Sequence, residues 1–359
     1  MKLLIHTIFC LMLCLTAAAQ TKVTKKIAAK ATDTGLTYSL PKTTITFRIE
    51  IIRTTAKAGP YYRYADKYLG VKNAIEADET SYQLGKIHVS TRGIPDTEQT
   101  YLIDFKPGTT SPYAYLTDEG LLCTINAEYE PSAEETPATP VPVPATADPV
   151  EEPAPVFLEE LLMAGSIAKQ AEVAAKQIYR IHESRLNILT GEADNLPPDG
   201  EAMKVVIQEL ERREKALTAL FTGSSTKETQ YHELTIVPYK DLEREVLFRF
   251  STQRGLVDAD DLGGTPVYIR LTAQETPVAP APNPKDAKKK EDPKGLVYNI
   301  PGKAQIQIDI NRETLYKGET LVAQFGRRDL LTPALFEDRK KPVRIYFYPE
   351  TGAIRQIIQ

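Results

Sequence analysis

The sequence predicts an α+β protein in which two mainly antiparallel, sandwich-like β regions flank a long antiparallel helical hairpin. Three observations support this fold class. Apolar and polar residues alternate in the first and last thirds of the 359-residue chain, apolar residues at helical spacing fill the middle, and proline-rich stretches interrupt the chain twice. Alternation is typical of strands with one buried face, whereas helical spacing gives a helix with one apolar stripe.

Residues 1–19 have the layout of a cleaved signal peptide. Lys2 supplies the positive start, an apolar run follows, and TAAA ends it before Gln20. No stretch reaches the roughly 20 apolar residues that span a bilayer, so we expect no transmembrane segment in the mature chain. A lipoprotein signal ending at Cys14 is the alternative, although Leu13 is not the small residue that such a site prefers. We expect an exported protein that is periplasmic or associated with the outer membrane.

Residues 20–130 are predicted to form the N-terminal β domain. In ITFRIEI (45–51), apolar and polar side chains alternate as in a strand with one solvent-facing side. Turn-forming residues separate this strand from those that follow it. A short helix is expected at 63–70, with Gly70 as its end.

A linker and a helical hairpin follow. Residues 131–155 contain eight prolines and almost no large apolar side chain, which predicts an extended linker. Residues 156–223 contain two apolar stripes at helical spacing, each followed by a helix-ending glycine, Gly191 and Gly223. The short connection between the stripes predicts that the two helices are antiparallel.

Residues 224–359 are predicted to form the C-terminal β domain. Segments such as REVLFRF and VRIYFYP are enriched in β-branched and aromatic residues, as strands are. A second proline-rich stretch, 274–294, lies between two of these strands and contains the basic run KDAKKK. We expect a long disordered loop there, inside one β domain.

Two phrases of the chain are nearly identical, GLTYSLP at 35–41 and GLVYNIP at 295–301. Each leads into an alternating strand, which favours an internal duplication of a β domain. The alternative is two edge strands that both stop at a proline, because proline lacks the N–H that continued pairing needs. The sequence leaves both interpretations open.

The chain contains four further phrases that are characteristic together with these two: GPYYRYADKYLG (59–70), ILTGEADNLPPDGEAM (188–203), ALFTG (219–223) and AQFG (323–326). Together they resemble a family of exported Bacteroidota proteins known only as a domain of unknown function. The resemblance covers most of the mature chain. It implies an architecture of β domain, helical hairpin and β domain and a location in the cell envelope, and it supplies no catalytic residue.

The composition argues against several classes of function. The net charge is −4 and no predicted domain has a basic surface, so nucleic acid is not an expected partner. His88, His182 and His232 are far apart in sequence and form no metal-binding motif. Cys123 is expected to be a buried core thiol, and no Walker loop, G-x-G-x-x-G or G-x-S-x-G motif occurs. GSIAK (165–169) matches S-x-x-K, but the companion phrases S-D-N and K-T-G are absent. We therefore assign no catalytic, cofactor-binding or metal residues, and a protein without enzymatic activity is favoured.

One cluster of side chains is a candidate contact for a ligand or partner: Tyr61, Tyr62, Tyr64 and Tyr68. Tyrosine rings stack on sugars and anchor protein interfaces. The alternative is that this segment covers one end of the β domain and buries the rings.

Two functions are compatible with these observations. The favoured one is a non-enzymatic interaction or scaffold protein that docks on another envelope protein through the helical hairpin and exposed strand edges. The other is a glycan-binding module or weak glycoside hydrolase that uses the tyrosine cluster and acidic residues, with no cofactor. The first predicts apolar side chains left exposed on the hairpin, and the second predicts a cleft that holds tyrosine and acidic side chains.

Overall fold

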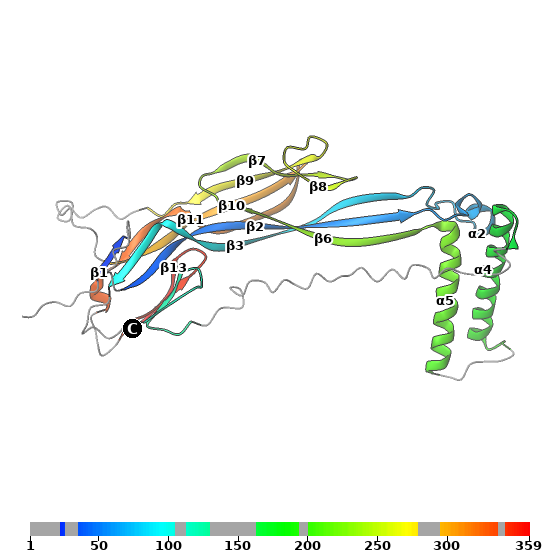
Figure 1. The fold of residues 1–359 in the computed structure, drawn as a ribbon, viewed down its shortest axis with the longest axis horizontal. Helices are drawn as coiled ribbons and strands as arrows, with labels where there is room; N and C mark the ends of the chain where they lie inside the picture. Colours follow the sequence, from blue (N-terminus) through cyan, green and yellow to red (C-terminus); the bar gives the residue numbers. More distant parts are fainter. Residues whose placement is uncertain are drawn as a thin grey trace, which may run out of the picture.

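The computed structural model describes residues 22–25, 35–104, 113–129, 163–193, 200–278, 295–336 and 342–359. Within these residues the protein is mostly β, with three antiparallel sheets and few helices. The antiparallel strands predicted within the α+β class are confirmed, but strands outweigh helices. Figure 1 shows an elongated molecule, in which the sheets gather at one end and a long ribbon of strands reaches to the helices at the other. The predicted signal peptide and the linker 131–155 lie outside the described residues, as does most of the loop 274–294.

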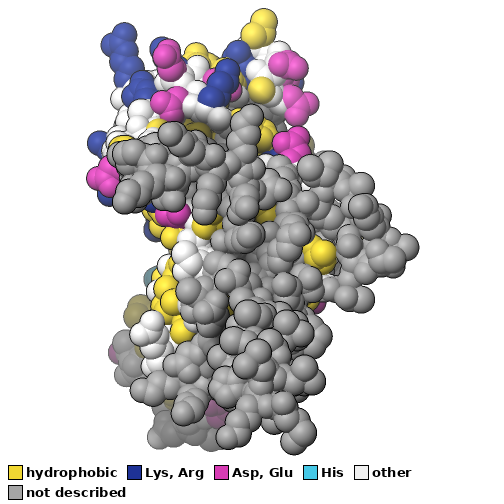
Figure 2. All heavy atoms as spheres, turned by 90° about the vertical axis from the view of Figure 1, so that its left-hand side faces the viewer, with side chains coloured by type: hydrophobic (Ala, Val, Ile, Leu, Met, Phe, Trp, Pro, Cys, Tyr) yellow, Lys and Arg dark blue, Asp and Glu magenta, His cyan; other side chains and the backbone are white. Residues whose placement is uncertain are grey.

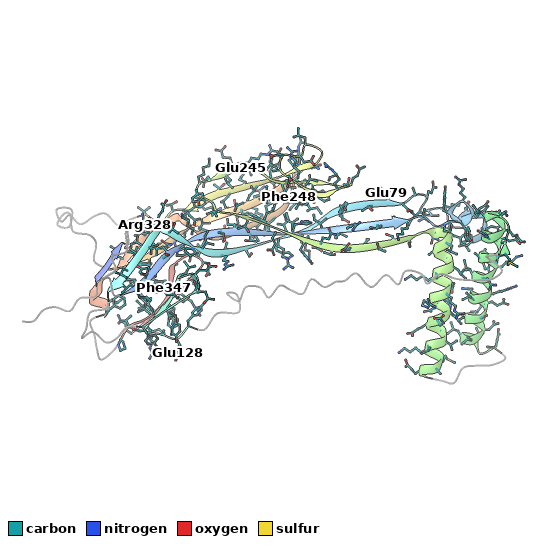
Figure 3. All side chains as sticks on the ribbon, viewed as in Figure 1. Glu79, Glu128, Glu245, Phe248, Arg328 and Phe347 are labelled. Atoms are coloured by element: carbon teal, nitrogen blue, oxygen red, sulfur yellow. The ribbon has the colours of Figure 1, made fainter. Side chains whose placement is uncertain are left out.

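The ribbon is part of a four-stranded sheet with the order β1-β3-β2-β6. Its strands are β1 (Lys22–Lys25), β2 (Leu36–Lys57), β3 (Glu79–Asp104) and β6 (Ser224–Ile236). β2 and β3 form a hairpin, and β6 pairs with β2 from Ile45 to Lys57. Because its central strand is hydrogen-bonded on both sides, the ribbon can extend away from the other sheets without leaving that strand's backbone unpaired. Glu79, at the start of β3, lies at the helical end of the ribbon (Figure 3).

A five-stranded sheet with the order β11-β10-β9-β7-β8 packs on the first sheet. Its strands are β7 (Leu242–Ser251), β8 (Gly255–Val257), β9 (Thr265–Glu275), β10 (Leu296–Ile310) and β11 (Glu313–Leu331). Alternate residues of both layers, among them Phe47 of β2 and Ile269 of β9, are buried in one core. Phe248 of β7 belongs to the same core (Figure 3). This is the packing of a two-layer sandwich.

A smaller sheet with the order β13-β12-β5-β4 closes the end opposite the helices. Its strands are β4 (Ala114–Leu116), β5 (Leu122–Ile125), β12 (Arg344–Tyr348) and β13 (Ala353–Ile358). Phe347 (Figure 3) belongs to a second core together with Tyr38 of β2 and Leu296 of β10, and the 3₁₀ helix η2 (Pro333–Phe336) packs against it. Cys123 of β5 is buried, as the sequence predicts.

The two β regions, 20–130 and 224–359, contribute strands to the same sheets. β6 pairs with β2, and β12 pairs with β5, so two of the three sheets combine strands from both regions. Alternation within a strand indicates which face is buried, but it carries no information about which strand lies alongside. The two ranges are therefore stretches of sequence that share sheets, and not two separately packed β units.

The two similar phrases occupy the same position in two equivalent hairpins. The leucine after Gly35 pairs with Ile103, and the leucine after Gly295 pairs with Leu331. In both places a Cβ on the glycine would lie 2.5 Å from the carbonyl oxygen of the partner residue. Any other amino acid would push the paired strands apart, which explains why glycine opens both phrases.

A similar β-bulge follows in each hairpin, one position later in the second phrase than in the first. In the first hairpin, Leu40 of β2 lies opposite residues 96–99 of β3, between two successive paired positions. In the second hairpin, Pro301 of β10 lies opposite residues 323–326 of β11 in the same way. One residue of the first strand thus faces four of the second in both hairpins. A bulge of this unusual size in two places favours a repeated unit over coincidence.

A short hairpin completes each unit. The N–H of Ser39 donates to the carbonyl oxygen of Gly120, and the N–H of Asn299 donates to that of Gly352, both at 3.0 Å. Both glycines have positive φ and form the turns of β4–β5 and β12–β13. The chain therefore contains an internal structural repeat, over residues 35–125 and 295–357.

The edge-strand interpretation of the two phrases is wrong, because neither strand ends at its proline. β2 continues through Pro41 and β10 through Pro301. Both prolines lie where the strand has only one neighbour, since β6 joins β2 at Ile45 and β9 joins β10 at Lys303. The missing N–H therefore removes no ladder bond on the second side.

The helices lie at the far end of the ribbon (Figure 1). The 3₁₀ helix η1 (Tyr62–Tyr64) and α2 (Ala65–Leu69) connect β2 to β3, and α4 (Ile167–Thr190) and α5 (Glu201–Thr222) lie beside them. α2, α4 and α5 end at glycines in the predicted places, Gly70, Gly191 and Gly223, each with φ between 69° and 78°. The three predicted helix ends are confirmed.

α4 and α5 run side by side across the direction of the ribbon (Figure 1). Arg185 of α4 forms ion pairs with Glu211 and Glu214 of α5, at 3.7 and 2.9 Å. Ile178, which comes earlier in α4, shares a core with Leu217, which comes later in α5, so the two helices are antiparallel. We refer to them as the helix pair.

Candidate functional site

The tyrosine cluster lies where the ribbon meets the helix pair. Tyr61 is only 4% exposed, and its ring centroid is 5.5 Å from that of Phe221 in α5. Its N–H donates to the carbonyl oxygen of Leu220 at 2.8 Å, and its hydroxyl donates to Gln170 Oε1 at 3.4 Å. Burial raises the pKa of Tyr61. Tyr61 thus joins the ribbon to both long helices.

Tyr64 and Tyr68 extend this junction, while Tyr62 stands apart from it. The rings of Tyr64 and Tyr68 are 6.2 Å apart, and Tyr68 meets Phe221 edge-on at 6.4 Å. Tyr62 is half-buried, and its hydroxyl accepts a hydrogen bond of 3.0 Å from Nε of the neighbouring Arg63. The structure therefore brings Tyr61, Tyr64 and Tyr68 together against the helix pair.

The backbones of ribbon and helix approach very closely at this junction. A Cβ on Gly59 would lie 2.3 Å from the carbonyl oxygen of Leu220, so only glycine fits there. Gly223 has a φ of +78°, and a Cβ on it would lie 2.5 Å from the carbonyl oxygen of Lys57. Glycines on both sides let β2 and the end of α5 pack without intervening side chains.

Small side chains complete the base of the helix pair. The buried residues of α4 are Ala171, Ala174, Ala175 and Ile178, at helical spacing, and those of α5 are Ala216, Leu217 and Phe221. All of them except Ala216 form one core with Tyr61 and Ala65. Alanines at this spacing allow helices to pack closely, and the core fixes the base of the helix pair to the ribbon.

The free end of the helix pair has no such cover. In the described residues, α4 has no buried residue after Ile178, and α5 has none before Ala216. Beyond Tyr179, which bonds to α2, four aliphatic side chains near the free end are exposed: Leu186 (52%), Leu189 (63%), Val205 (55%) and Val206 (37%). We call these four residues the apolar tip.

Sequence reasoning identified only part of the apolar tip. Leu189 and Val206 belong to the two predicted apolar stripes, whereas Leu186 and Val205 lie beside them. A stripe indicates which face of a helix is apolar, but not whether anything covers that face. The apolar tip could have been inferred from the length of the helices. Both helices extend well beyond the packed base, which alanines such as Ala171 and Ala175 mark at a spacing of four residues.

Two cavities lie elsewhere, on the sheets. The first has a volume of about 640 Å³ and is lined by Tyr113, Tyr129 and Tyr346 with Glu128 and two arginines, beside β5, β12 and β13. The second, of about 490 Å³, opens on the five-stranded sheet. Tyrosine and acidic side chains do meet in a cleft, but the four tyrosines of the predicted cluster line neither of these two cavities.

The described residues offer neither a metal cluster nor a membrane-spanning helix. No three His, Cys, Asp or Glu side chains in them are placed to hold a metal ion. Among the same residues, no helix combines the length and the apolar character needed to cross a bilayer. Seen from the end opposite the helices, basic and acidic side chains are interspersed in the visible part of the surface (Figure 2).

The chain can be compared with known proteins at the level of its family. No curated protein and no solved structure matches it. A family model described as a domain of unknown function (DUF4831) matches residues 34–355, which include the first repeated unit, the helix pair and all but the last two residues of the second unit. The chain therefore belongs to the family that shares this domain of unknown function.

Proposed function

We propose that this protein is an exported, non-enzymatic interaction protein that docks on another protein of the cell envelope through the apolar tip. The observation that carries the proposal is the exposure of Leu186, Leu189, Val205 and Val206 together at the free end of two helices. Exposed apolar residues that gather on one element, and are not scattered singly, are typical of surfaces that meet a partner. A helix face of this kind fits an apolar groove or another helix.

The rest of the fold supports this role by holding the tip in place. Tyr61, Tyr68 and Phe221 anchor the base of the helix pair on the ribbon. The ribbon carries the helix pair to the end of the molecule opposite the small sheet (Figure 1). A docking element that is already ordered loses less entropy on binding than a flexible one. In this account Tyr61, Tyr64 and Tyr68 position the docking element, and Tyr62 is the member of the cluster left to contact a partner or ligand.

A pull-down from native envelope extract tests the docking role. Tagged protein starting at Gln20 is compared with a Leu186→Ser, Leu189→Ser variant and with a control, Leu262→Ser, which removes an 83% exposed leucine from the β8–β9 turn. We expect one stoichiometric partner with the wild type and the control, and its loss with the double variant. Capture of the partner by all three proteins, or by none, would contradict the proposal. Far-UV circular dichroism checks that the helices persist in each variant.

Export is a separate part of the proposal and has its own test. It is supported by the signal-like residues 1–19, with small residues at 17 and 19. Cell fractionation followed by N-terminal sequencing is expected to find the protein in the envelope fraction with Gln20 as its first residue. A cytoplasmic protein that retains its first nineteen residues would contradict export while leaving the docking role open to the pull-down.

A further inference from the structure

The second cavity, on the outer face of the five-stranded sheet, carries an excess of positive charge. It is lined by Arg244, Pro266, Tyr268, Arg270, Gln307, Asp309, Asn311, Arg312 and Thr314, all described residues. The charged side chains of this lining are three arginines and one carboxylate. Arginine stays charged at any physiological pH, so the cavity has a formal charge of +2.

Strand geometry places these side chains on one face. Val267, Ile269 and Leu271 of β9 point into the core, so Tyr268 and Arg270 point outward. On β10, Gln307 lies directly opposite Arg270, and Asp309 lies directly opposite Tyr268. Side chains opposite each other in neighbouring strands share a face and lie close together. The β10–β11 turn adds Arg312, whose φ of +72° belongs to a tight hairpin turn.

Two of the arginines are held by neutral groups, and none of the three has an anionic partner in the described part of the chain. Arg244 stacks on the ring of Tyr268, 4.1 Å from its centroid. Arg270 donates from Nε to the carbonyl oxygen of Glu243 at 3.1 Å. This bond leaves the outer nitrogens of Arg270 for other acceptors, and no ion pair joins any of the three guanidinium groups to a described carboxylate.

The one carboxylate of the cavity is held by neutral donors. Asp309 accepts from Nε2 of Gln307 at 2.9 and 3.0 Å and from Oγ1 of Thr314 at 2.7 Å. It therefore lies beside the arginines without neutralising any of them through a direct contact. Glu243 and Glu245 on β7 do not line the cavity. Lys317, opposite Gln307 on β11, adds another cation to the same face.

We propose that this cavity binds a small acidic sugar, whose carboxylate or phosphate is held by Arg244, Arg270 and Arg312. Guanidinium groups pair with both oxyanions through two parallel hydrogen bonds. Gln307, Asn311 and Asp309 supply the amide and carboxylate groups that bind sugar hydroxyls. A volume of about 490 Å³ is within the range of pockets for small ligands. This site is independent of the apolar tip and of the docking role.

Ligand-detected NMR titrations test the site and separate the two oxyanions. The probes are D-glucuronate, glucose 6-phosphate, inorganic phosphate and neutral glucose, each titrated into protein starting at Gln20. We expect saturable binding of glucuronate or of glucose 6-phosphate, whichever oxyanion the site prefers, and at least about tenfold weaker binding of glucose, because it offers no charge-assisted hydrogen bond. Inorganic phosphate is expected to bind more weakly than glucose 6-phosphate, since it has no sugar hydroxyls.

Two variants and one control locate the binding. Arg270→Gln and Arg312→Gln are each expected to weaken binding of the preferred acidic sugar about tenfold. Arg63→Gln removes the same charge from an exposed position at the helical end and is expected to change nothing. The proposal is overturned if no acidic sugar binds saturably, if glucose binds as tightly, or if Arg63→Gln weakens binding as much as Arg270→Gln. Inorganic phosphate binding as tightly as glucose 6-phosphate would overturn the role of the sugar. Unchanged melting temperatures show that each variant is folded.

Discussion

At the scale of single residues, the tyrosines near the ribbon tip have different roles. Tyr61 is buried against Phe221, whereas Tyr62 contacts the exposed Arg63. The sequence shows four similar residues within eight positions, and the spacing alone cannot say which ring faces the helices. That depends on α4 and α5, which come about 100 positions or more later in the chain. The clustering of tyrosines could be predicted, but which of them pack against the helices could not.

Replacing Tyr61 tests this division. We expect Tyr61→Ala to lower the free energy of unfolding by about 3 kcal/mol, because it removes a buried aromatic ring from the junction and leaves a cavity. Tyr62→Ala is expected to cost less than about 1 kcal/mol, since this ring contacts an exposed arginine. Urea denaturation followed at 222 nm measures both. An equal loss in the two variants would show that Tyr62 supports the helix pair as much as Tyr61 does.

At the scale of elements, the sequence predicts more. Alternation identifies β2 and β10, helix-ending glycines mark the ends of α4 and α5, and the repeated phrase indicates the duplicated hairpin. The sequence does not reveal that both strands continue beyond their prolines. A proline within a strand is tolerated only where no neighbouring strand pairs with the side that lacks the N–H group. Whether Pro41 and Pro301 meet that condition depends on where β6 and β9 begin to pair, which no local pattern records.

The surface charges of α4 predict a dependence on pH. Hydrogen bonds from Lys176 and Lys169 lower the pKa of Glu172 from its ordinary value of 4.5 to about 2. The stabilisation from this carboxylate is therefore complete above about pH 4.5 and disappears as the pH falls towards 2. Because Glu172 lies on the helix surface and is partly exposed, salt screens the effect and keeps it small.

We expect Glu172→Gln to lower the melting temperature at pH 7, and this difference from the wild type to vanish near pH 2. Glu183→Gln serves as the control, because Glu183 is exposed on the same helix and makes no ion pair with the described residues. Thermal melts by circular dichroism from pH 7 to pH 2 measure the difference. A difference that persists unchanged at pH 2 would rule out the ion pairs as its cause.

At the scale of the whole molecule, the β regions form one interleaved structure. In the largest core, Ile45, Phe47, Ile49, Ile51 and Ile87 come from the first region, and the other ten buried residues come from the last. The composition and patterns of 20–130 suggest an independent domain because each strand has its own buried face. The side chains that cover that face belong to strands some 200 residues later. Such long-range packing cannot be recognised from the local sequence pattern.

A fragment of residues 20–130 is therefore expected not to fold alone. It lacks β6, β12 and the five-stranded sheet, so β2 has an unpaired edge and its buried face is exposed. Circular dichroism and size-exclusion chromatography should show an unfolded or aggregated chain, and co-expression with residues 156–359 should recover a folded complex. A cooperative melt of the isolated fragment would contradict the interleaved arrangement.

The proposed docking role requires that another protein covers the apolar tip in the cell. The most direct measurement places a photo-activated cross-linking amino acid at Leu189, in the native host, with the same replacement at Leu262 as a control of similar exposure. We expect one cross-linked product from position 189, formed with a single envelope protein, and none from position 262. No product at position 189, or the same products from both positions, would contradict it.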